Sequence, residues 1–98
     1  MVEEQPAETI RVRMPRGREM IGVINEMLGA SRFNVTGIDG KTRICRIPGK
    51  FRKSVKMSRG DLVILEPWEI EPDAKADIIW IYTRTQAAWL VRRGVWKS

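Results

Sequence analysis

Five short apolar segments separated by turn-forming residues constrain the fold of this chain more than any other feature. Each segment has the length of a β-strand, and glycine or proline bounds four of the five. In chain order they are Met20–Leu28, Phe33–Ile38, Thr42–Ile47, Asp61–Leu65 and Asp77–Tyr82. A chain of 98 residues has room for one domain, so the pattern predicts a single all-β domain of five strands.

Turn residues link the middle segments. Asp39-Gly40 lies between the second and third segments, and it is a strong hairpin signal because glycine readily adopts positive φ. Pro48-Gly49 ends the third segment. The residues that follow, Lys50–Val55, are too few and too charged for a core strand. A single helical or 3₁₀ turn is therefore predicted there.

The fifth segment needs cover on both faces, because it is apolar at every position after Asp77. The interior of a barrel would cover one face. A helix over Thr83–Arg93 is predicted to cover the other. Thr83 and Gln86 have capping-box spacing, and Gly94 can close the helix end. We expect this helix to pack against the outside of the barrel.

Five strands with a helical turn after the third describe the oligonucleotide-binding (OB) fold, here in an S1-like form with an added C-terminal α-helix. This fold binds its ligands on the second and third strands and the adjoining loops. The predicted parts are a flexible N-terminal arm over residues 1–18, the barrel over 19–83, the helix over 84–94 and a short tail over 95–98.

The chain is basic, and its charges are segregated along the sequence. Its 18 Lys and Arg against 12 Asp and Glu give a net charge of +6. Ordinary surfaces mix both signs to limit self-repulsion, so a base-only window predicts a surface that attracts phosphates, provided that its cations converge in the fold. The alternative is a plain solvated face. The window holds Lys41, Arg43, Arg46, Lys50, Arg52, Lys53, Lys56 and Arg59.

Composition argues against an enzyme, a secreted protein and a membrane protein. The absence of histidine removes the commonest general base and zinc ligand, and a single cysteine, Cys45, leaves no internal disulfide. The longest apolar stretch, Ile78–Tyr82, is far too short to span a bilayer, and the N-terminus has no apolar signal segment. We expect a cytoplasmic, monomeric protein that needs no cofactor or metal.

Several blocks of the sequence resemble, in the same order, those of the translation initiation factor 1A family. The resemblance covers about residues 16–93, and Gly49-Lys50-Phe51-Arg52-Lys53 resembles the family's Gly-Lys-aromatic/aliphatic-Arg-Lys signature. Bacterial initiation factor 1 is similar but smaller, and it lacks the C-terminal helix. The matching blocks are Met27–Gly29, Asp39-Gly40, Arg43–Lys53, Asp61–Leu65 and Lys75–Ile79.

The resemblance implies binding to the RNA of the small ribosomal subunit, in the aminoacyl-tRNA site. There the protein would block premature tRNA entry and help to place initiator tRNA and mRNA, with other initiation factors as further partners. The N-terminal arm is short and begins acidic, and no long acidic extension follows Gly94. These departures from eukaryotic members favour an archaeal-type factor. They also put in question any tail-mediated docking to the subunit-joining GTPase.

The basic turn after the third strand supplies the first candidates for RNA contact. Lys50, Arg52 and Lys53 are close enough in sequence to approach a single bend of RNA backbone. Arg43 and Arg46 lie on opposite faces of the third strand, so only one of them can point outward. Arg46 is favoured if the apolar residues beside it face the core.

Other basic and aromatic residues extend this candidate surface. Lys41 and Lys56 flank the basic turn and are expected to steer association. Arg16 and Arg18, in the arm, are expected to follow RNA on binding. Phe33 fits a base-stacking role and a core role equally well. The remaining large aromatics are assigned to packing: Phe51, Trp68, Trp80 and Trp89.

Two other functions fit parts of the sequence. A general single-stranded RNA chaperone of cold-shock type would use the same barrel. It would need several exposed aromatics on the second and third strands, where only Phe33 occurs. A protein-interaction adaptor would use the acidic segment Glu66–Asp77 instead.

Overall fold

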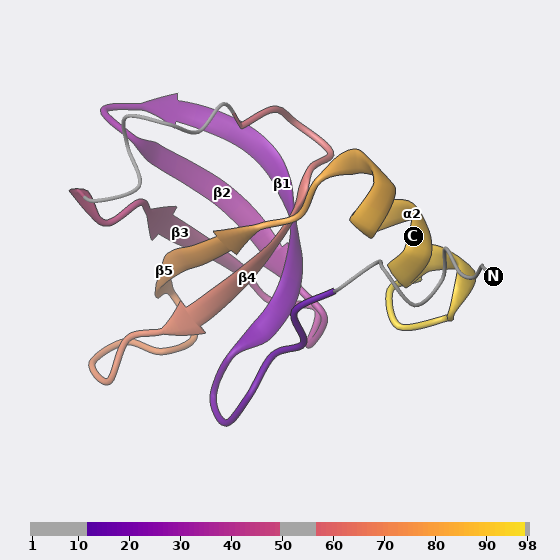
Figure 1. The fold of residues 1–98 in the computed structure, drawn as a ribbon. Helices are drawn as coiled ribbons and strands as arrows, with labels where there is room; N and C mark the ends of the chain where they lie inside the picture. The colour runs from indigo at the N-terminus through magenta and orange to yellow at the C-terminus, as the bar shows by residue number, and fades with distance from the viewer. Residues whose placement is uncertain (1–11, 50–56, 98) are drawn as a thin grey trace, which may run out of the picture.

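The computed structural model describes residues 12–49 and 57–97, and in them five strands close into a barrel with one helix outside it (Figure 1). The helical turn predicted after the third strand lies outside the described residues. The elements are β1 (Met20–Gly29), β2 (Arg32–Gly37), β3 (Thr42–Arg46), β4 (Leu62–Pro67), β5 (Lys75–Ile81) and α2 (Arg84–Arg92).

Antiparallel pairing joins most of the barrel, and one parallel pairing closes it. The order around the barrel is β1-β2-β3-β5-β4. The closing contact is the parallel ladder between β3 and β5, in which Ile44 pairs with Lys75 and Arg46 with Asp77. The predicted five-stranded barrel with a C-terminal helix is confirmed, although β4 and β5 have different ends from those predicted.

The β2–β3 hairpin turns through three residues, Ile38, Asp39 and Gly40. Gly40 has a φ of 84°, and its N–H donates to the Gly37 carbonyl at 2.9 Å. The Gly37 N–H in turn donates to the Lys41 carbonyl at 2.9 Å. A glycine in the left-handed region is typical of three-residue hairpins. The turn fixes the register of the two strands beyond it.

The barrel interior is filled by apolar side chains from all five strands. Val35, Cys45 and Ile78 are among the members that are completely buried. Gly22 of β1 lies where the walls come closest together, because an added Cβ would stand 2.5 Å from a Leu65 methyl and 2.9 Å from the Thr36 carbonyl oxygen. Only glycine fits there without displacing the core.

A second apolar cluster lies outside the barrel, between α2 and strands β1 and β4. Leu90 of the helix and Trp96 beyond it pack on Ile21 and Ile64, which point outward from the sheet. The capping box is formed as predicted: the Thr83 hydroxyl accepts from the Gln86 N–H at 3.2 Å, and the Gln86 side chain accepts from the Thr83 N–H at 3.0 Å. The helix therefore covers the barrel's outer wall (Figure 1).

Residues 12–18, the end of the arm expected over 1–18, contact the barrel. Val12 packs against the outer apolar cluster, and the Arg13 carbonyl accepts a hydrogen bond from the Tyr82 hydroxyl. Burial raises the pKa of Tyr82 to about 12, so this hydroxyl stays protonated and can donate even in moderately alkaline solution. Arg13 also contacts Glu19 at 3.4 Å. The rest of the expected arm, residues 1–11, lies outside the described part of the chain.

Candidate nucleic-acid interface

The outer face of β2 and β3 carries two arginines directly opposite each other. The hairpin register pairs Arg32 with Arg46, and both side chains are exposed. Like charges placed opposite each other destabilise a sheet, so this pair calls for a compensating anion. For Arg46 that anion is internal. Arg32 has no carboxylate within ion-pair distance among the described residues.

Arg46 is held by β5 and by the residue that follows β4. Its Nε donates to the Asp77 carboxylate at 2.9 Å, and its guanidinium lies 4.7 Å from the centroid of the Trp68 ring. The Trp68 indole N–H donates to the same carboxylate oxygen at 3.0 Å. The Arg46 side chain is still 59% exposed. This arrangement fixes the plane of the guanidinium while leaving its outer N–H groups facing solvent.

Arg43 lies on the opposite face of β3 and is buried, with 3% of its side chain exposed. Its Nη atoms donate to both oxygens of Asp39 at 2.8 and 3.1 Å, and its Nε donates to the Pro72 carbonyl at 2.6 Å. The hydrogen bonds from Arg43 hold the pKa of Asp39 below its usual value. The prediction of an RNA contact from Arg43 is corrected, because this guanidinium joins the β2–β3 turn to the β4–β5 connection instead.

Phe33 is a core residue rather than a base-stacking platform. Only 8% of it is exposed, and it packs inside the barrel with Val35 and Cys45. Burial also raises the pKa of the Cys45 thiol to about 12, so this cysteine is a buried apolar residue.

The remaining predicted contacts are spread over the surface. Lys41 is exposed and pairs with Asp73 at 2.9 Å. Arg18 is exposed and donates to the Trp68 carbonyl at 3.2 Å. Arg16 is exposed in the turn that precedes β1. The other four predicted contacts, Lys50, Arg52, Lys53 and Lys56, lie outside the described residues.

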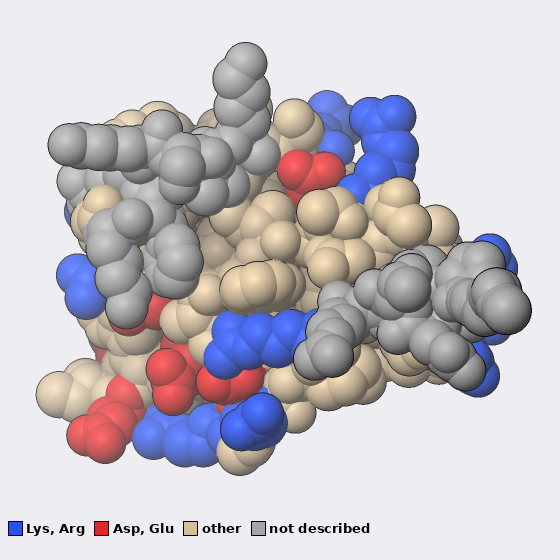
Figure 2. Space-filling model, in the orientation of Figure 1, with Lys and Arg blue, Asp and Glu red and all other residues tan. Residues whose placement is uncertain are grey.

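The described cations of the base-only window do not form an unbroken basic surface. Three of the four contact carboxylates: Lys41 with Asp73, Arg43 with Asp39, and Arg46 with Asp77. Figure 2 shows acidic side chains gathered at the lower left, over the β4–β5 connection, with basic side chains beside them. Within residues 41–49 and 57–59 the expected convergence of free cations is therefore not found.

Two residues of this face were not predicted as contacts. Arg32 could have been found from the three-residue turn at Gly40, which sets the register that places it opposite Arg46. Trp68 was assigned to packing, but it belongs to neither apolar cluster and lies beside Arg46 on the surface. Trp80 is likewise outside both clusters, whereas Trp89 packs against the outer one, as predicted.

The strand order, the parallel closure and the outer face on β2 and β3 define an OB-fold protein. Two solved structures share this fold. YjeQ from Thermotoga maritima matches with a TM-score of 0.55 at 22% identity, over 67% of this chain and 23% of that one. The bacterial translation initiation factor 1 from a Wolbachia endosymbiont of Brugia malayi matches with a TM-score of 0.53 at 29% identity, over 68% of this chain and 79% of that one.

Sequence comparison identifies the family within this fold. The family model described as translation initiation factor 1A / IF-1 matches residues 8–98. Translation initiation factor 1A of Methanococcus aeolicus is 48% identical over 95% of this chain and 90% of its own length. The Pyrococcus abyssi protein of that name is 48% identical over 89% of this chain and 77% of its own length. The chain belongs to the translation initiation factor 1A / IF-1 family.

Within the described residues, no group of three or more Asp, Glu, His or Cys side chains is placed to hold a metal ion. The same part of the chain contains no helix long and apolar enough to cross a membrane.

Proposed function

We propose that this initiation factor binds the small ribosomal subunit at the aminoacyl-tRNA site and supports the placement of initiator tRNA and mRNA by contacting rRNA. It acts in the cytoplasm as a monomer, by occupancy and electrostatics and without catalysis. The observation that carries the proposal is the Arg32–Arg46 pair on the outer face of β2 and β3. Asp77 already compensates Arg46, so an RNA phosphate is the external anion that would pair with Arg32.

The pair lies at the end of β3 that leads into the basic segment 50–56. Arg32 offers a guanidinium with no ion-pair partner among the described residues, and Arg46 offers one whose orientation Asp77 and Trp68 fix in advance. A fixed guanidinium loses little freedom on binding, and its planar donors match two phosphate oxygens. The two arginines therefore form one end of the proposed contact.

The other predicted contacts extend it along the RNA. Lys50, Arg52, Lys53 and Lys56 are proposed to meet the phosphates that follow, as the family signature implies. Lys41, Arg16 and Arg18 are proposed to steer the approach. The side chains of Lys41 and Arg18 already contact protein groups. Arg43 and Phe33 are left out because they are buried.

Co-sedimentation with purified small subunits over a range of salt concentrations tests the proposal. Each phosphate contact adds about 0.7–0.9 to the slope of log K against log salt. Arg32→Ala is therefore expected to lower the slope by about that amount, and the double replacement of Arg52 and Lys53 by about twice as much. Arg92→Ala, an exposed change on α2, is the matched control.

A nuclease footprint on the same subunits locates the contact. Protection confined to the aminoacyl-tRNA site is expected, and protection that Arg32→Ala leaves unchanged in both extent and salt dependence would remove this face from the proposal. Burial of Phe33 disfavours the cold-shock alternative, because β2 and β3 as described expose no aromatic side chain. Competition by bulk single-stranded RNA as strong as by small subunits would support that alternative.

A further inference from the structure

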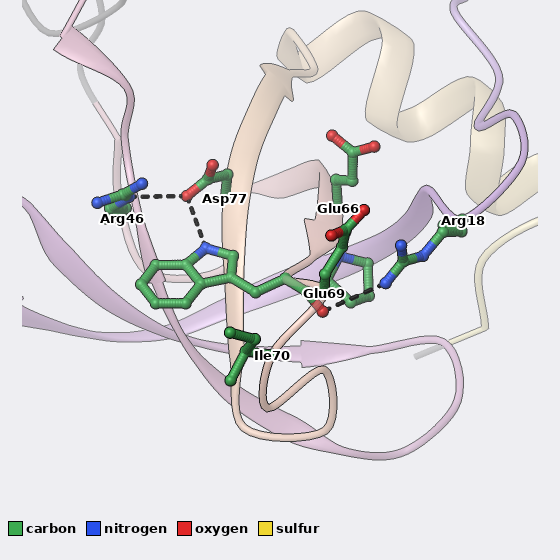
Figure 3. Close-up of a pocket in the computed structure, with 8 residues that line it drawn as sticks. Arg18, Arg46, Glu66, Glu69, Ile70 and Asp77 are labelled. Carbon is green, nitrogen blue, oxygen red and sulfur yellow. Dashed lines mark hydrogen bonds and ion pairs between the residues drawn. The ribbon is translucent and has the colours of Figure 1, made fainter.

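A hollow of about 600 Å³ lies beside the β4–β5 connection (Figure 3). Its volume is in the range of sites that hold a peptide side chain or a small ligand. Apolar groups come from Pro67, Trp68 and Ile70. Carboxylates come from Glu66 and Glu69 among others. We call this feature the β4–β5 hollow.

The charges that line the β4–β5 hollow leave it acidic. Three carboxylates line it against two arginines. Arg46 contacts the carboxylate of Asp77, whereas Arg18 donates to the neutral Trp68 carbonyl and keeps its charge (Figure 3). Among the described residues, neither Glu66 nor Glu69 has a cation within ion-pair distance. A phosphate entering the hollow would meet these two carboxylates against the single charge of Arg18, whereas a cationic side chain would pair with them.

The apolar part of the hollow has the form of a protein-binding anchor. Ile70 is 78% exposed, the largest exposure among the large apolar side chains of the described residues. Next to it in the hollow, the Trp68 ring is held by its hydrogen bond to Asp77 and by the Arg46 guanidinium. Rigid tryptophans and arginines are enriched where protein partners bind, because little entropy is lost when they are covered.

We propose that the β4–β5 hollow binds a basic segment of a protein partner, in which lysine or arginine side chains flank an apolar residue. The apolar residue would contact Ile70 and Trp68, and the cations would pair with Glu66 and Glu69. The inference rests on the proposed function in one respect, since the partner is met on the small subunit. It gives the protein two adjacent contacts, one with RNA through the outer face of β2 and β3 and one with protein through this hollow, and Arg46 borders both.

Site-specific crosslinking tests this contact on the assembled subunit. The photoreactive residue p-benzoylphenylalanine is placed at position 70, and at position 91 as a control on α2, where Val91 is also exposed. Both proteins are irradiated in complex with purified small subunits. We expect a product from position 70 that resists ribonuclease and yields, by mass spectrometry, a partner peptide with a net positive charge. Position 91 should not yield the same peptide.

A variant that lacks the two glutamate charges of the hollow tests whether the crosslink depends on them. Replacing Glu66→Gln and Glu69→Gln together should lower the crosslinking yield at position 70 several-fold, while the salt dependence of co-sedimentation stays close to that of the parent. Crosslinking to rRNA, to a protein segment without basic residues, or with a yield that the double variant leaves unchanged would overturn the inference. A factor that fails to co-sediment counts against the proposed function instead.

A second measurement needs no ribosome. The Trp68 indole N–H is followed by NMR during titration with a nine-residue peptide of alternating lysine and leucine. We expect this resonance to shift before the other three indole resonances, and to shift less in the double variant. An unchanged Trp68 resonance at peptide concentrations that shift other indoles would refute the inference, whatever the outcome on the subunit.

Discussion

Replacing Asp39→Ala should destabilise this protein more than any other loss of a surface carboxylate. The change leaves the Arg43 guanidinium, 3% exposed, without the two hydrogen bonds that it donates at 2.8 and 3.1 Å. A hydrogen bond to a charged group contributes about 1.5–3 kcal/mol. Asp39 is itself 31% exposed, so water can reach the vacated side. The expected loss is about 2–3 kcal/mol of the free energy of unfolding.

Urea denaturation at neutral pH measures this loss. With a slope of about 1–2 kcal/mol per molar urea, the midpoint should fall by about 1–3 M. Asp73→Ala is the control, because its ion pair with Lys41 is exposed on both sides and its contact with Arg43 is long, at 3.9 Å, so its loss should cost less than about 1 kcal/mol. The double variant Asp39→Ala, Arg43→Met should be more stable than Asp39→Ala alone, since it removes the orphaned charge.

The free energy of unfolding lost in Asp39→Ala should also depend on pH in a defined direction. Arg43 lowers the pKa of Asp39 from its usual 3.8, so the folded state gains stability from the carboxylate above that value. This gain is lost as the pH falls through the lowered pKa of the folded state. The difference between parent and Asp39→Ala should therefore be constant near neutral pH and shrink below about pH 4. A loss under about 0.5 kcal/mol at neutral pH, or a double variant no more stable than the single, would refute the reasoning.

Three further predictions follow from the packing. The Cys45 thiol, buried with a pKa of about 12, should not react with a thiol reagent such as DTNB until the protein unfolds, and labelling of the native state would contradict its placement. Thr83→Ala should lower the free energy of unfolding by about 1 kcal/mol, because it removes the capping box. Thr85→Ala should lower it less. Equal urea midpoints for the two variants would argue against a stabilising cap. Gly22→Ala should lower the free energy of unfolding, measured by thermal denaturation, by at least about 2 kcal/mol, whereas Gly49→Ala should leave it almost unchanged, because only the Cβ at position 22 would clash. An unchanged stability of Gly22→Ala would mean that the barrel wall can move.

Local signals in the sequence were sufficient for the hairpin, the helix cap and most of the strand assignments. The ends of β4 and β5 were not predictable in the same way. β4 continues to Pro67 because it pairs there with Ala76 of β5. Its pairing with β1 ends at Leu65, so on that side a proline without an N–H is tolerated. β5 begins at Lys75 because it pairs there with Ile44 of β3, a partner distant in sequence.

The charge pattern shows the same limit more sharply. Bases and acids that occupy separate stretches of sequence are brought together by the parallel β3–β5 ladder, which places Arg46 beside Asp77. Lys41 pairs with Asp73 just before these two strands begin. Strand alternation did predict that Arg43 and Arg46 would face opposite sides, with Arg46 outward. Strand alternation could not identify the acidic residues that lie on the adjacent strand.

The outer apolar cluster bears on how the chain emerges during its own synthesis. Ile21 and Ile64 point away from the barrel, and the residues that shield them, Leu90 and Trp96, are made after all five strands. A nascent chain that has closed its barrel still exposes an apolar surface along β1 and β4 until those residues leave the ribosomal exit tunnel. Premature termination before α2 should therefore yield a fragment that exposes this apolar surface, aggregates readily and is bound by chaperones.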